Sequence, residues 1–91
     1  MDEKYIKYIT SLKFSSVQCY RILLTLTIKI CTQAQLCNLL EIRNQHIARY
    51  IKELEALNLI EVDRIEGRNK FYKAVTELNK IQQEKNIKCN L

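Results

Sequence analysis

The scarcity of residues that interrupt regular backbone most constrains what this chain can fold into. Its 91 residues include no proline and a single glycine, Gly67. Proline breaks helices and interior strands, and glycine is the usual residue where the backbone takes a positive φ. A mostly helical protein is therefore expected, with Gly67 marking one particular turn. Because 47% of the residues are hydrophobic and 27% are charged, residues 1–91 are expected to form one globular domain.

The N-terminal third predicts two helices. The stretch "YIKYITSL" at 5–12 places apolar side chains at i, i+3, i+4 and i+7, which predicts a helix over about 3–12. A second helix is expected at about 17–29, with Ser15 or Ser16 as its N-cap. Apolar residues occupy so much of its circumference that this helix should be central in the core or covered by a partner.

The middle of the chain predicts two further helices joined by a tight turn, over about 32–58. "CTQAQLCNLLEI" begins with Thr32, a candidate N-cap, and supplies the leucine stripe of a short helix. "RNQHIARYIKELEALNLIEV" follows from residue 43 and predicts the second helix of the pair. Asn58 is expected to end that helix, because asparagine tolerates the left-handed backbone that closes many helices.

After residue 58 the apolar period changes from helical to alternating. "LIEVD" at 59–63 and "KFYKAV" at 70–75 predict two strands joined by a loop at Gly67. Thr76 is a candidate cap for a last helix through about 86. The predicted fold class is therefore mainly α with a small β-hairpin, a winged helix-turn-helix with its wing at about 59–75.

The second helix of the pair carries a polar face of a kind that reads DNA. At about 100° per residue, the core side centres on Ile47 and Ile51, and the opposite side collects arginine, lysine and amide side chains. Arginine matches the edge of guanine, and amides match adenine. Basic residues also surround Gly67 at the loop tip, where they could reach phosphates or a minor groove. The predicted DNA-binding residues are Arg43, Asn44, Gln45, His46, Arg49, Lys52, Arg64, Arg68 and Lys70.

Net charge, the N-terminal sequence and cysteine spacing further limit the class of protein to which this chain can belong. A formal charge of +5 favours a polyanionic partner. The acidic start "MDEK" and the short apolar run at 22–30 predict neither a secretory signal nor a membrane span, so a cytoplasmic protein is expected. The cysteines at 19, 31, 37 and 89 lack metal-ligand spacing and are expected to be free thiols. No catalytic residues, cofactor or metal are predicted.

Three segments together resemble the winged-helix repressors of the ArsR and MarR type: "SSVQCYRILLTL", "TQAQLCNLLEIRNQHIARYIKELEALNLIEV" and "IEGRNKFYKAV". The similarity covers about residues 15–76. It implies a homodimer with pairing terminal helices, about 3–12 and 76–86, and two recognition helices on a two-fold symmetric DNA site. Carried over to this chain, the base-reading residues are Asn44, Gln45, His46 and Arg49, with Arg68 at the wing tip.

Two residues depart from the pattern of that family in the turn between the paired helices. Glu41 stands where glycine is usual, and Arg43 stands where a capping serine is usual. Asn44 is therefore an alternative candidate for the N-cap of the second helix.

The expected function is sequence-specific binding of double-stranded DNA, as a homodimeric transcriptional repressor. One alternative is a DNA-binding accessory factor for plasmid or phage replication, partition or conjugative transfer. Another is a winged helix that docks on a protein and binds no DNA. No nucleophile with a neighbouring base and no phosphate-cradling glycine loop is recognisable, so an enzyme is not expected.

Overall fold

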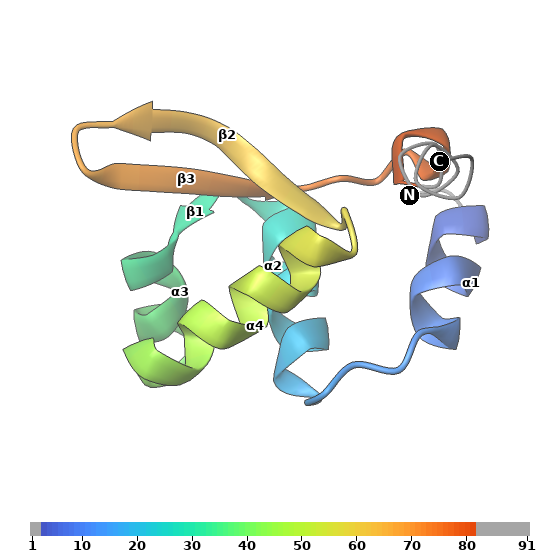
Figure 1. The fold of residues 1–91 in the computed structure, drawn as a ribbon, viewed down its shortest axis with the longest axis horizontal. Coiled ribbons are helices and arrows are strands. Elements are labelled where there is room, and N and C mark those ends of the chain that lie inside the picture. The colour runs from blue at the N-terminus through green and yellow to red at the C-terminus, as the bar shows by residue number, and fades with distance from the viewer. Residues whose placement is uncertain (1–2, 82–91) are drawn as a thin grey trace.

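The computed structural model describes residues 3–81 (Figure 1). The described part is a small α+β fold of helices and a three-stranded antiparallel sheet. The elements in chain order are α1 (Glu3–Ser11), α2 (Gln18–Ile28), β1 (Cys31–Thr32), α3 (Gln33–Leu40), α4 (Asn44–Ala56), β2 (Ile60–Glu66) and β3 (Asn69–Ala74). Residues 78–81 form a further helical turn. The two consecutive helices joined by a short turn, and the hairpin that follows them, are therefore present as the sequence predicts.

The first two predicted caps have different outcomes. Thr32 caps α3 as predicted: its hydroxyl accepts from the Gln35 amide at 3.1 Å, and the Gln35 side chain accepts from the Thr32 amide at 2.9 Å. This reciprocal pair is a capping box. In α2 the N-cap position belongs to Val17, and Ser16 assists from one residue earlier by accepting from the Gln18 amide at 3.1 Å.

Left-handed residues close both helices of the pair. Asn58 has a φ of 61°, as predicted, and the Leu59 amide donates to the Leu54 carbonyl at 3.0 Å. At the end of α3, Glu41 has a φ of 54°, and the Ile42 amide donates to the Cys37 carbonyl at 3.2 Å. Both bonds belong to the Schellman pattern, in which a left-handed residue reverses the chain. Glu41 therefore takes the conformation that glycine usually supplies.

The sheet has one strand more than the predicted hairpin. The two-residue strand β1 pairs with β3, so that Cys31 lies opposite Tyr72 and Thr32 opposite Phe71, and the sheet order is β1-β3-β2. Two residues are too few to show an alternating pattern, which is why the sequence did not reveal β1. Gly67, with a φ of 63°, turns the hairpin as predicted. The pairing of β1 fixes the hairpin beside the start of α3.

A single cluster of buried side chains lies between the helices and the sheet. In α1, Tyr5 is fully buried, and the rest of the predicted stripe packs against this core. Helix α2 is central on one side, while Leu24 and Ile28 on its other side are 60% and 76% exposed. Only one side of the apolar helix α2 is therefore buried in the core.

The last predicted helix begins later than expected. Glu77, and not Thr76, holds the position before the first helical turn, because its carbonyl accepts from the amides of Lys80 and Ile81. Residues 82–86 of that predicted helix lie outside the described residues. Helix α1 lies at the end of the molecule away from the hairpin tip, whereas α3 and the start of α4 lie beneath the hairpin (Figure 1).

Candidate nucleic-acid interface

The two faces of α4 divide as the helical period predicts. Ile47, Ile51 and Leu54 are buried, with exposures of 0%, 2% and 0%. Gln45 and Arg49 are exposed on the opposite side. Two further predicted residues, Arg43 and Lys52, are also exposed. The prediction from the helical period, that the polar face of α4 is exposed, is therefore confirmed.

The two predicted base-reading residues His46 and Arg49 contact each other. Nη2 of Arg49 lies 3.2 Å from Nδ1 of His46, and the Arg49 guanidinium lies 5.9 Å from the centre of the Tyr50 ring. Because an arginine side chain can only donate, Nδ1 of His46 is the acceptor in this contact. The contacts with His46 and Tyr50 therefore orient Arg49.

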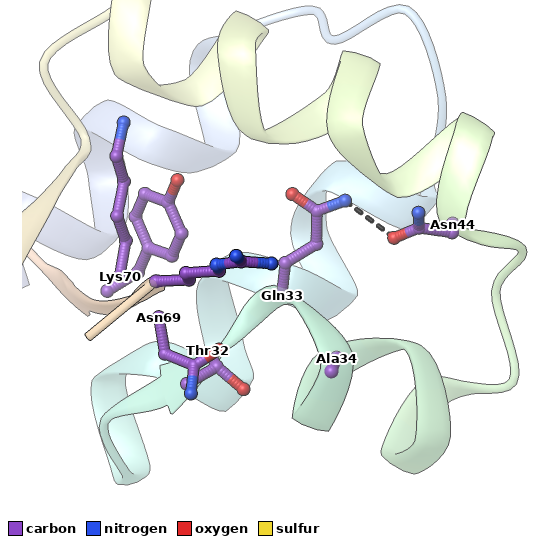
Figure 2. A pocket seen from close by; sticks show the side chains of 8 residues that line it. Thr32, Gln33, Ala34, Asn44, Asn69 and Lys70 are labelled. Atoms are coloured by element: carbon purple, nitrogen blue, oxygen red, sulfur yellow. Dashed lines mark hydrogen bonds between the residues drawn. The ribbon is translucent and has the colours of Figure 1, made fainter. Parts of the chain in front are cut away.

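Asn44 is not the N-cap of α4. The N-cap position is Arg43, whose side chain makes no capping bond, and Asn44 is the first helical residue. Its Oδ1 accepts from Nε2 of Gln33 at 2.6 Å (Figure 2). The same oxygen accepts from Sγ of Cys37 at 3.7 Å. The alternative assignment of Asn44 as the cap is therefore wrong. Its side chain joins the start of α4 to α3 instead.

The basic residues of the hairpin fall into two groups. Arg64 forms salt bridges with Asp63 at 3.1 Å and Glu66 at 2.7 Å, and it stacks on Phe71 at 4.1 Å. The hydrogen bonds to Glu66 and Asp63 raise the pKa of Arg64. Within residues 3–81, Arg68 and Lys70 form no salt bridge. The predicted basic hairpin therefore keeps unbalanced charge at Arg68 and Lys70, while two acids balance the charge of Arg64.

A pocket of about 420 Å³ lies between the start of α3, the start of α4 and the hairpin (Figure 2). Its lining combines two cations with hydroxyl and amide side chains and contains no acid. The lining residues are Thr32, Gln33, Ala34, Asn44, Arg68, Asn69, Lys70 and Tyr72. Three predicted residues thus meet here: Asn44, Arg68 and Lys70. Sequence reasoning missed Thr32, Gln33 and Asn69 as surface-site residues, because no motif marks them and only the β1–β3 pairing brings them together.

The cysteines of the described part are free thiols. Cys19 and Cys31 are buried, and Cys37 is half-buried. Burial raises the pKa of Cys19 to about 11 and also raises the pKa of Cys31 and Cys37. Over residues 3–81 no group of three or more histidine, cysteine or acidic side chains is arranged to hold a metal ion. Cys89 lies outside the described residues.

Two comparisons with known proteins return nothing. No protein-family model matches the chain, and no curated protein matches it. Among the described helices, none has the length and apolar character needed to cross a bilayer.

Proposed function

We propose that this protein binds double-stranded DNA as a winged helix-turn-helix, with the start of α4 in the major groove and the β2–β3 hairpin as the wing. The observation that carries the proposal is the acid-free pocket, at which the unpaired cations Arg68 and Lys70 meet the start of α4. Gln45 and Arg49 are exposed on the same helix, α4. Phosphates attract such cations, and arginine and amides match base edges.

The charge order along α4 supports the same orientation. Arg43, Gln45 and Arg49 come first, and the acids Glu53 and Glu55 come only in the second half of the helix. A recognition helix contacts base edges mainly with its N-terminal residues. In a tip-first orientation the acids would lie where the helix leaves the groove, away from the phosphates.

The proposed role is that of a transcriptional repressor acting as a homodimer on a two-fold symmetric site. A DNA-binding accessory factor for replication, partition or transfer of a mobile element would use the same surface. Selecting bound duplexes from a random library and locating the site in the genome separates the two roles. A promoter site supports the repressor, and repeated sites at an origin support the accessory factor.

A titration of labelled duplex at increasing salt tests DNA binding itself. The logarithm of the binding constant is expected to fall linearly with the logarithm of the salt concentration. The slope should be about −0.9 for each phosphate that the protein neutralises. Affinity that does not change with salt would contradict the proposal and favour a winged helix that docks on a protein.

The variant Arg49→Ala tests the placement of α4 in the groove. We expect it to lose about 1–3 kcal/mol of specific affinity and to relax the preference at one base pair, because an arginine–guanine pair is lost. The matched control is Lys7→Ala, which removes one exposed charge on α1 at the far end of the molecule. An unchanged affinity in Arg49→Ala would remove this residue from the interface.

A further inference from the structure

The amide oxygen of Asn44 is already occupied within the protein. Oδ1 accepts from Nε2 of Gln33 at 2.6 Å and from Sγ of Cys37 at 3.7 Å. An amide oxygen has two lone pairs, and both donors come from α3. Within residues 3–81 the Nδ2 group donates to no protein acceptor. Asn44 therefore offers two donors and no acceptor to a ligand.

This restriction conflicts with base reading. An asparagine that recognises adenine uses both halves of its amide, the oxygen to accept from N6 and the nitrogen to donate to N7. Asn44 can supply only the second of these. Its neighbour Gln45 is exposed and has both halves of its amide free within the described residues. Gln45, and not Asn44, keeps the chemistry for adenine.

Two further side chains of the pocket can only donate. Arg68 and Lys70 line the same pocket as Asn44 and have no acceptor atoms in their side chains. No acid lines the pocket to repel an anion. Phosphate oxygens are acceptors only, and they form strong bonds to charged donors.

We infer that this pocket binds a phosphoryl group of the DNA backbone and that Asn44 contacts it through Nδ2. This inference rests on the proposed function and assigns Asn44 to positioning the protein on DNA, where the family resemblance implies base reading. A free phosphate ester presents the same oxygens, so the test must separate the two sources.

The first experiment compares Asn44→Asp with Gln45→Glu on duplexes in which each base pair is replaced in turn. Asn44→Asp keeps an oxygen for Gln33 and removes the donor. We expect it to weaken binding to every duplex by the same factor, about tenfold. Gln45→Glu adds the same charge one residue away and is expected to change the preference at one base pair.

Each other result of this comparison has a defined meaning. If Asn44→Asp changes the preference at one base pair, or leaves every affinity unchanged, the inference is overturned while DNA binding stands. If the unmodified protein shows no salt-dependent binding to any duplex, the proposed function fails first. Melting curves by circular dichroism establish that both variants are folded.

The second experiment identifies which phosphate of the duplex the pocket contacts, by comparing the unmodified protein with Asn44→Asp. Duplexes carry one neutral methylphosphonate linkage at a time. At one linkage we expect the unmodified protein to lose affinity about tenfold. At that linkage Asn44→Asp should show no further loss, because the effects of removing two groups that contact each other do not add. Losses that add at every linkage would overturn the inference.

Inorganic phosphate, titrated into the free protein at constant ionic strength, distinguishes the second source. The readout is the backbone amide NMR signals of Gln33 and Asn44. Saturable shifts, with no methylphosphonate linkage at which the loss is absent in Asn44→Asp, would assign the pocket to a free phosphorylated compound and overturn the contact with DNA. Such a linkage together with no saturable shift supports the backbone phosphate.

Discussion

At the scale of single residues, Glu41 and Asn58 both have a left-handed backbone conformation, although their side chains differ. Their φ values are 54° and 61°. Asparagine visits this region at low cost, whereas for most other residues it costs about 1–2 kcal/mol. Glu41 stands in the turn that sets α4 relative to α3. The protein therefore carries backbone strain next to its candidate interface.

Replacing Glu41 tests this strain. Glu41→Gly is expected to raise the free energy of unfolding by about 1 kcal/mol, because glycine takes a positive φ without a steric penalty. Glu41→Ala is the control, since it removes the side chain but keeps the penalty. Urea titrations of both variants measure the effect. An equal gain in the two variants would mean that the glutamate side chain, and not the backbone, carries the cost.

At the scale of elements, one side-chain contact ties the second half of α4 to the turn before α2. The carboxylate of Glu53 accepts from the backbone amide of Ser15 at 2.9 Å and from the Ser15 hydroxyl. The hydrogen bonds from the Ser15 hydroxyl and amide lower the pKa of Glu53 below its ordinary value of 4.5. Glu53 is therefore committed to holding α4 in place.

The lowered pKa predicts how stability depends on pH. A carboxyl group whose pKa is lower in the folded state stabilises the fold above its unfolded pKa, and this contribution disappears as pH falls through the folded pKa. At neutral pH, Glu53→Gln is expected to lower the free energy of unfolding by at most about 1 kcal/mol, given its partial exposure. Denaturant titrations across pH should show this difference closing in acid. A difference independent of pH would contradict the role of the charge.

In the hairpin, paired and unpaired arginines predict different effects on DNA binding. Arg68→Ala is expected to weaken binding to all sequences alike and to reduce the salt slope by about 1, through one lost phosphate contact. Arg64→Ala is the matched control, because Asp63 and Glu66 already balance that charge. The same titrations measure both variants. An effect of Arg68→Ala limited to one base pair would instead make Arg68 a base contact.

At the scale of the whole molecule, the exposed apolar residues of α2 bear on the proposed homodimer. The predicted stripe of α1 packs into the chain's own core. Leu24 and Ile28, together with Val17 before the helix, remain 60%, 76% and 68% exposed. Leu24 also lines an apolar pocket of about 200 Å³ between α1 and α2. If the proposed second copy binds this chain, these exposed apolar residues are the surface on which we expect it.

The variant Ile28→Glu tests the dimer. It should convert a dimer to a monomer at micromolar concentration, because a charge would be buried in the interface. The melting temperature of the isolated chain should change little, since Ile28 is 76% exposed. Sedimentation with and without DNA measures the oligomeric state. A monomeric unmodified protein under both conditions would end the homodimer proposal.

Local features of the sequence were enough to predict the helices, the hairpin and the exposed face of α4. The capping box at Thr32, the left-handed Asn58 and the turn at Gly67 each depend on residues within a few positions of one another. Apolar spacing likewise sorted α4 into a buried and an exposed side. Such features follow from backbone geometry that is the same wherever the segment lies.

The tertiary structure alone decided which polar groups are still available for a ligand. Strand β1 pairs with β3, although α3, α4 and β2 separate them in the sequence, so that Thr32 lies opposite Phe71. Asn44 is engaged by α3, and only Arg68 and Lys70 remain unpaired in the hairpin. These outcomes depend on distances between separate elements and on competition among nearby charges. A one-dimensional pattern contains neither, because a hydrogen bond or salt bridge forms only where folding brings the two groups within reach.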